Sequence, residues 1–434
     1  MIACTKENFI GRSGGRGLST NMGMTDMRTR RDVLRWIALA PLAGFLSEFR
    51  ALAAPLAGKV KITAVKAMAL DHMAGNCLIR VDTDAGVSGI GEAGATGPIA
   101  RARIETMKPL LIGKDPLDLG VHWEKMTSLM YNYVAHIPTV SGIDIALWDL
   151  AGKLLNQPVH VLLGGRYRET IPMYSHGENV NMLDKGSCRE WAQRIRARPE
   201  GFTVYKNNVN EPLGVPQGVY SASLTTQQIR NARIGFDNAR EAVGEDIDLA
   251  VHAHGELDAL SSIQIAKVVE SMNPLWFEDP MNPVFHQGWM DLRRSTTIRI
   301  LTGEKLEMVR QFRPFLDSGA IDIVHPDLAF SGGITGVKKI ADYAALSRTP
   351  VALHNVGSLV MTFANAHFGC TIQNLFKVES ALAHQGRYVE AMAATNGPVV
   401  QKGEMTIPVG VGLGVDLNQD YLRRYLLAGE PFWS

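Results

Sequence analysis

The chain has 434 residues, of which 46% are hydrophobic and 20% are charged, and its formal net charge is +1 at pH 7. This length is sufficient for a large core and a second domain. Because the charges are nearly balanced, with no basic stripe and no aromatic platform, the composition argues against nucleic-acid binding and favours a small-molecule substrate.

The first 58 residues are expected to form a signal peptide and linker rather than part of the fold. The sequence TRRDVL (29–34) precedes an apolar stretch (36–46), and ALA (51–53) offers a small-residue cleavage site before Ala54. This pattern resembles a twin-arginine export signal, so we expect a periplasmic protein. An amphipathic helix or an uncleaved anchor is the alternative. Roughly a dozen apolar residues are too few to span a bilayer, so we expect no membrane anchoring.

Residues 59–165 are expected to form an α+β capping domain. Residues 59–92 contain strand-like runs joined by an Asp-Ala-Gly turn. From 98 to 157 the pattern becomes helical, most clearly over 141–155, where isoleucine and leucine residues share one face. The C-terminal segment 386–434 is expected to pack back against this domain.

A (β/α) barrel is predicted over residues 166–385. Short apolar runs are followed by acidic or imidazole residues at intervals of roughly 23 to 27 residues, which fits one strand, one helix and two turns. Two earlier strands, at 171–174 and 202–205, complete a set of eight. Such runs fit parallel strands buried on both faces, and the active sites of barrels lie at the carboxyl ends of the strands. The residues that end the runs are His252, Glu278, Glu304, Asp327, His354 and Glu379.

Six short motifs, in this order and spacing, resemble the enolase superfamily in its mandelate racemase/muconate lactonizing enzyme branch, most closely the galactonate/mannonate (acid-sugar) dehydratase type. The motifs are GEA (91–93), SGIDIALWDLAGK (141–153), LLGG (162–165), WFEDP (276–280), TGE (302–304) and HPDLAFSGGITG (325–336). The resemblance implies a modified TIM barrel of the β7α type with an N-terminal α+β cap. It also implies that the enzyme removes the proton α to a carboxylate and that a divalent metal, usually magnesium, holds the resulting enediolate.

The resemblance also implies a set of metal ligands. Carboxylates at the ends of the third, fourth and fifth barrel strands bind the metal in this family, and here those positions hold His252, Glu278 and Glu304. The glutamates offer the hard oxygen ligands that magnesium prefers. His252 is a departure, because an imidazole removes one negative charge and shifts the preference toward manganese, iron or zinc. Glu379 or Asp258 could restore the missing charge.

The base is expected to be a histidine paired with an aspartate. His354 and Asp327 match the family pair at the ends of the seventh and sixth strands. A carboxylate bonded to one imidazole nitrogen fixes the tautomer, raises the basicity and leaves the other nitrogen facing the substrate. His254, two residues after His252, matches the general acid of the dehydratases. A structural role or a second metal-binding role is the alternative for His254.

Lys206 and Asn208 occupy the positions where racemases carry Lys-x-Lys. Asn208 cannot accept a proton at neutral pH, so a two-base racemase mechanism loses one partner. Lys-x-Asn resembles the galactonate dehydratase pattern, in which the lysine contacts the substrate carboxylate, and a salt bridge is the alternative for Lys206. We expect further substrate contacts from His176, His325 and Glu379.

Together these residues predict a metal-dependent acid-sugar dehydratase that converts an aldonate into a 2-keto-3-deoxy acid. Two alternatives stay open because of His252: an epimerase or lyase that acts on another periplasmic carbohydrate, and a sugar-acid binding protein without catalysis. The resemblance also implies a homo-oligomer. The insertion 210–225, rich in Gly, Pro and Ser, is expected to be a lid or an oligomer contact.

Overall fold

The computed structural model describes residues 49, 51–71, 73, 75–128, 136–221, 223–380 and 399–433. Ala51–Ser434 form one compact unit. The predicted twin-arginine motif lies outside the described residues, and the domain boundaries at 165 and 385 stay predictions. Among the described residues, every helix is too short or too polar to cross a membrane.

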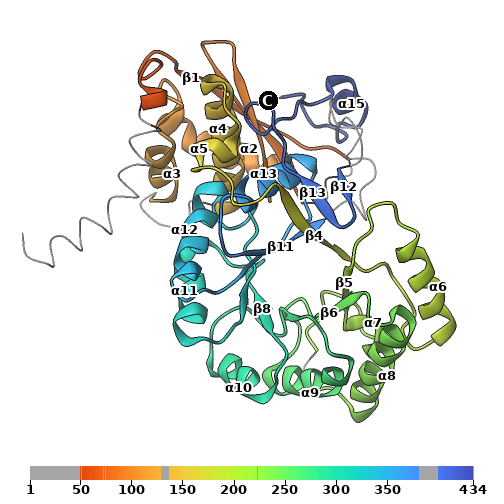
Figure 1. Cartoon of the computed structure of the whole chain (residues 1–434). Coiled ribbons are helices and arrows are strands. Elements are labelled where there is room, and N and C mark those ends of the chain that lie inside the picture. Colours follow the sequence, from red (N-terminus) through yellow and green to blue (C-terminus); the bar gives the residue numbers. More distant parts are fainter. Residues whose placement is uncertain are drawn as a thin grey trace, which may run out of the picture. The chain divides into compact units, whose positions relative to one another are not determined.

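The cap consists of a three-stranded antiparallel sheet covered by helices (Figure 1). Its strands are β1 (Ile62–Met68), β2 (Cys77–Thr83) and β3 (Ser88–Ala93), and its helices are α2 (Gly97–Leu111), α3 (Leu119–Thr127), α4 (Ile137–Leu155) and α5 (Val159–Leu162). Most of α4 is buried, and it packs directly on β3. Gly91 of β3 permits this contact, because a Cβ there would lie 2.3 Å from the carbonyl oxygen of Gly142. The close packing fixes the position of the next residue, Glu92.

Parallel strands close into a barrel. Among the described residues, eight strands pair in sequence order, and the last pairs with the first. They are β4 (Thr170–His176), β5 (Val204–Asn208), β6 (Asp248–His252), β7 (Phe277–Glu278), β8 (Ile300–Thr302), β9 (Ile323–Val324), β10 (Val351–Leu353) and β11 (Leu375–Ser380). The predicted barrel with an N-terminal α+β cap is therefore confirmed.

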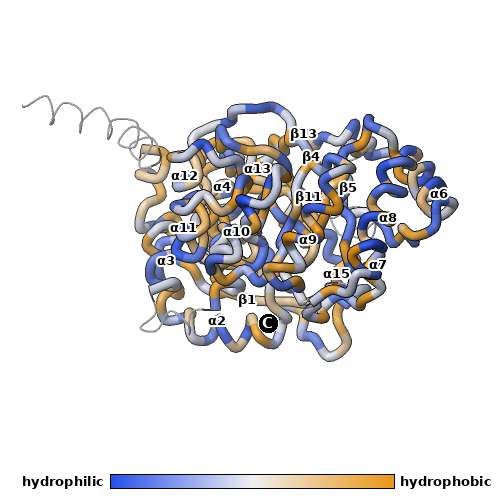
Figure 2. The backbone as a smooth tube through the Cα atoms, turned by 90° about the horizontal axis from the view of Figure 1, so that it is seen from below, coloured by the Kyte–Doolittle hydropathy of each residue, from blue (hydrophilic) through white to orange (hydrophobic). Residues whose placement is uncertain are grey.

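Helices surround the barrel strands (Figure 1). They are α6 (Lys185–Arg196), α7 (Asn210–Leu213), α8 (Thr226–Val243), α9 (Ala259–Val269) with the 3₁₀ turn η2 (Glu270–Met272), α10 (Gln287–Ser295), α11 (Met308–Ser318), α12 (Gly333–Ala345) and α13 (Leu359–Gly369). Figure 2 shows α6 and α8 as largely hydrophilic. The buried residues of α6, which include Trp191 and Ile195, lie on one face. Strands covered in this way are buried on both sides, which explains their apolar runs.

The inward side chains of the barrel form an apolar layer below a polar layer. The apolar cluster contains Tyr174, Val204, Ala250, Trp276, Leu301, Ile323 and Ala352. Because side chains alternate along a strand, the residue two positions later points to the same side, nearer the carboxyl end. Two positions after members of this cluster stand His176, Lys206, His252, Glu278, His325 and His354. The fold thus places these six predicted site residues as a polar ring above the apolar layer.

The C-terminal segment contacts both the cap and the barrel. Its strands β12 (Val400–Gln401) and β13 (Glu404–Thr406) form a hairpin, β13 pairs antiparallel with β4, and α15 (Gln419–Arg424) follows. Leu426 forms a bridge with Leu70 of the cap, and Glu430 accepts a hydrogen bond from the Ala69 N–H at 2.9 Å. Residues 381–398, which precede this segment, lie outside the described part of the chain.

Candidate active site

A cavity of about 330 Å³ lies at the carboxyl ends of the barrel strands. This volume suits a small molecule. The predicted site residues that line it are His176, Lys206, His252, His254, Glu304, His354 and Glu379. The residues that line it without having been predicted are Gln217, Asn355, Val356 and Ser380. Residues far apart in the sequence thus meet in one small-molecule site.

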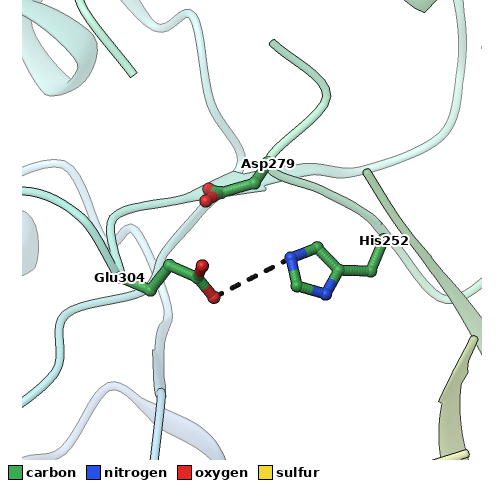
Figure 3. A group of neighbouring side chains, drawn as sticks. All are labelled: His252, Asp279 and Glu304. Atoms are coloured by element: carbon green, nitrogen blue, oxygen red, sulfur yellow. Dashed lines mark ion pairs between the residues drawn. The ribbon is translucent and has the colours of Figure 1, made fainter. Parts of the chain in front are cut away.

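His252, Asp279 and Glu304 converge on one point (Figure 3), with candidate ligand atoms within 4.8 Å of one another. The Nε2 of His252 lies 3.8 Å from Oε2 of Glu304. Within the described part of the chain, neither ring nitrogen of His252 has a hydrogen-bond partner, nor does Oε2 of Glu304, although all three atoms are buried. Burial lowers the pKa of His252 well below its usual value, so the imidazole is neutral, as a metal ligand must be. These buried atoms fit a divalent cation, although Oε2 of Glu304 also lies 3.2 Å from Nε2 of His354.

Asp279 is a member of this group that sequence reasoning missed. It follows Glu278 directly, so strand alternation would point it away from the cavity. Asp279 follows the end of the strand and adopts a left-handed backbone conformation, with a φ of 41°. Its carboxylate accepts a hydrogen bond from Lys305 Nζ at 2.9 Å. Asp258, considered as a source of negative charge, does not line the cavity. It caps α9 by accepting a hydrogen bond from the Ser261 N–H at 2.7 Å.

Lys206 lies between two buried carboxylates. Its Nζ is 2.6 Å from Oε1 of Glu278 and 2.8 Å from Oε1 of Glu379. Burial opposes the charge on Lys206, but the carboxylates outweigh it and hold the pKa of the lysine above its usual value. The Tyr174 hydroxyl donates to Oε2 of Glu379 at 3.0 Å, and the Trp276 indole N–H donates to Oε2 of Glu278 at 2.9 Å. Protein donors thus engage both oxygens of Glu278. The other two predicted metal ligands, His252 and Glu304, each have an atom without a hydrogen-bond partner. Lys206 forms a buried ion pair.

The predicted base pair is assembled. The Nδ1 of His354 lies 2.6 Å from Oδ2 of Asp327, whose other oxygen accepts a hydrogen bond from the Ala329 N–H at 2.6 Å. The Nε2 of His354 is 3.2 Å from Oε2 of Glu304. Burial opposes the charged form of His354, but Glu304, Glu379 and Asp327 outweigh it and raise the pKa of the imidazole to about 9. The cavity therefore contains an imidazole with a strong affinity for a proton.

His254 lies against His252, with ring centroids 3.7 Å apart. Strand β6 ends at His252, and His254 has a φ of 53°. The two rings therefore come together through a backbone turn. The expected cause was the alternation of side chains along a strand. Burial lowers the pKa of His254 to about 4, below the near-neutral range expected of a general acid. The Nε2 of Gln217 lies 2.9 Å from Nε2 of His254. Gln217 comes from the predicted insertion, whose unusual length was the one sequence signal for it.

Asn208 and His325 lie behind the cavity lining. His176 lines the cavity, and its Nε2 is 3.2 Å from Oδ1 of Asn208, which itself does not line it. His325 is fully buried, with its Nδ1 2.8 Å from the carbonyl oxygen of Ala352 and its Nε2 3.5 Å from Oε1 of Glu278. These two predicted substrate contacts therefore touch neighbouring side chains instead of the cavity.

Known proteins resemble this chain over most of its length. Residues 57–164 match the N-terminal domain of mandelate racemase / muconate lactonizing enzyme, and residues 188–421 match the enolase C-terminal domain-like family. A D-xylonate dehydratase from Haloferax volcanii is 33% identical over 378 residues, which cover 86% of this chain and 91% of that protein. A D-gluconate dehydratase from Thermoproteus tenax is 28% identical over 369 residues, which cover 82% of this chain and 72% of that protein.

The solved structures show the same relationship. A mandelate racemase/muconate lactonizing enzyme-like protein from Rubrobacter xylanophilus superimposes with a TM-score of 0.79 at 29% identity, over 86% of this chain and 99% of that one. The motifs, the capped barrel and these matches agree. The chain belongs to the enolase superfamily, in its mandelate racemase/muconate lactonizing enzyme branch.

Proposed function

We propose that this enzyme, a dehydratase of the enolase superfamily, converts an aldonate into a 2-keto-3-deoxy acid. The relatives named D-xylonate dehydratase and D-gluconate dehydratase support a sugar-acid substrate. One observation carries the proposal: His354, bonded to Asp327, faces a cavity beside Glu304 of the candidate metal group. A base next to a cation site is the arrangement that abstraction of a proton α to a carboxylate requires.

In this proposal His354 removes the C2 proton through Nε2. Asp327 accepts the N–H of Nδ1, which fixes the tautomer and stabilises the imidazolium as it forms. The nearby carboxylates Glu304 and Glu379 raise the pKa of His354, which stabilises the imidazolium that forms when the C2 proton is transferred. The product of this step is an enediolate.

His252, Glu304 and Asp279, with Glu278 beside them, would hold the divalent metal that members of this superfamily use. Magnesium is the ion that the family resemblance implies, and manganese, iron and zinc are the alternatives that the imidazole favours. When bound, such a cation supplies the positive charge that stabilises the enediolate and offsets the charge of Glu304 beside His354.

The C3 hydroxyl needs a proton as it leaves. His254 lines the cavity and is our first candidate donor, although burial keeps it neutral at pH 7. His354 carries the C2 proton after the first step, so it is the second candidate donor. It serves this role if the C2 hydrogen and the C3 hydroxyl leave from the same face.

Incubation of the metal-loaded protein with a panel of pentonates and hexonates tests the proposed function. We expect an α-keto acid from at least one of them. Exchange of the C2 proton with solvent in the absence of elimination would favour an epimerase. Tight binding without exchange would favour a binding protein.

Substitution His252→Asp should change which metal the protein retains. A carboxylate restores the charge that magnesium prefers, so we expect magnesium affinity to rise on the order of tenfold and zinc affinity to fall. Calorimetric titration of the metal-free protein, with elemental analysis, measures both. His176→Asn, in the cavity wall but outside the metal group, should leave metal content unchanged. A wild-type protein that binds no divalent metal, beside an Asp variant that does, would contradict the account.

We also propose export to the periplasm by the twin-arginine route, supported by Arg30 and Arg31 ahead of the apolar stretch. Cell fractionation should recover the wild-type chain from the periplasm and the double lysine variant from the cytoplasm. A cytoplasmic wild-type chain would contradict this. The family resemblance further leads us to propose a homo-oligomer, and a monomeric mass by light scattering would rule it out.

A further inference from the structure

We infer that Glu92 of the cap positions the loop that carries His354, so that one buried carboxylate couples the cap to the base. The inference rests on the proposed role of His354. Glu92 is fully buried at the end of β3. Its oxygens accept hydrogen bonds from the Ser358 N–H at 3.0 and 3.1 Å and from the Asn76 side-chain amide at 2.9 Å. The Ser358 hydroxyl donates a further bond to the same carboxylate.

Ser358 is the N-cap residue of α13. Its Oγ accepts a hydrogen bond from the Val360 N–H at 3.2 Å, which caps the helix. Glu92 therefore receives the Ser358 N–H just ahead of the helix and adds a negative group at the helix N-terminus, where the helix dipole favours one. Burial raises the pKa of Glu92 above its usual value, and the hydrogen bonds from Ser358 and Asn76 offset this shift only in part. The cap thus supplies an anchor for a helix of the barrel.

Three residues separate this anchor from the base, and hydrogen bonds hold two of them as well as His354 itself. The Gly357 N–H donates to Oδ1 of Asn355 at 3.2 Å, and Nδ2 of Asn355 donates to the carbonyl oxygen of Glu379 at 3.2 Å. The His354 N–H donates to the carbonyl oxygen of Pro326 at 3.1 Å. Asn355 also lines the cavity. A displacement of Ser358 would therefore be passed along a constrained loop to the base.

Close packing on both sides prevents Glu92 from moving independently. A Cβ on Gly357 would lie 2.9 Å from Oε1 of Glu92 and 2.6 Å from Cβ of Met361. On the cap side, the neighbouring Gly91 already packs against the backbone of α4. The backbone beside Glu92 thus packs on α4, and its carboxylate contacts the residues just ahead of α13. We class Glu92 as a positioning residue because it does not line the cavity.

Hydrogen exchange of Glu92→Gln, read by mass spectrometry on the full chain, tests this coupling without any substrate. The amide keeps the shape of the side chain but loses one acceptor and the charge. We expect exchange to rise about tenfold, the effect of losing roughly one hydrogen bond, both in the 354–358 peptide and in the peptide with Asn76. With an aldonate that the wild type dehydrates, we expect kcat to fall about tenfold and KM to change less than threefold.

Glu430→Gln is the matched control. Glu430 is also a buried carboxylate of the cap region, and it accepts hydrogen bonds from the Ala69 N–H and from Arg101. It should raise exchange near Ala69 and leave the 354–358 peptide and kcat at wild-type values. The coupling would be overturned if the 354–358 peptide of Glu92→Gln exchanged at the wild-type rate. It would also be overturned if exchange in that peptide rose equally in both variants. Because exchange needs no turnover, a protein that dehydrates no aldonate would refute the proposed function while leaving this test decisive.

Discussion

His354→Asn should lower kcat for aldonate dehydration about 10³-fold, the range that loss of a general base produces. Nδ2 of the asparagine can occupy the position of Nδ1 of His354, which lies 2.6 Å from Oδ2 of Asp327. The hydrogen bond to Asp327 is therefore retained. The variant lacks only the Nε2 that faces the cavity. Binding of the substrate should change little, and kcat at saturating aldonate, with the metal supplied in excess, measures the loss.

His367→Asn provides the control for this substitution. His367 is also buried, but it lies in α13 against His160 and does not line the cavity. The same chemical change there should leave kcat within about twofold of the wild type. A His354→Asn variant that keeps more than a tenth of wild-type kcat would mean that another group removes the C2 proton.

Lys206→Met should destabilise the fold by about 3–5 kcal/mol, because removal of one partner leaves buried charge uncompensated. The side chains of Lys206, Glu278 and Glu379 are exposed by 1%, 0% and 2%, so water cannot take over the role of the ammonium. Methionine fills a similar volume without charge or donors. Chemical denaturation, followed by circular dichroism, measures the difference in the free energy of unfolding.

Lys338→Met is the comparison for this loss of charge. Lys338 pairs with Asp342 on the outer helix α12, and the two side chains are exposed by 32% and 60%. Exposed ion pairs of this kind contribute less than about 1 kcal/mol to the free energy of unfolding. Equally small losses of unfolding free energy in Lys206→Met and Lys338→Met would show that the ion pair in the barrel does not stabilise the fold. Lys206 would then be free to bind a substrate carboxylate.

The barrel and its polar ring could be predicted because they follow from short-range rules. Each strand needs an apolar run, and the residue at its carboxyl end faces the mouth. His252, Glu304 and His354 satisfy both conditions, and the structure places all three in the cavity wall. The pairing of His354 with Asp327 was implied by the family resemblance, and the two residues form a bridge between neighbouring strand ends in the structure.

The remaining details depend on turns and side-chain directions that a sequence pattern does not contain. Asp279 joins the candidate metal group through a left-handed residue at a strand end. Gln217 reaches the cavity from an irregular loop. Lys206 and Glu278 were both predicted to be functional, but only their rotamers show that they bind each other at 2.6 Å.

Proton NMR of an aldonate incubated with the metal-loaded protein in D₂O tests the central claim most directly. The account predicts a 2-keto-3-deoxy acid that carries one deuterium at C3, formed by the wild type and not by His354→Asn. Substrates that keep their C2 proton across the whole panel, or that exchange it without losing water, would contradict the claim.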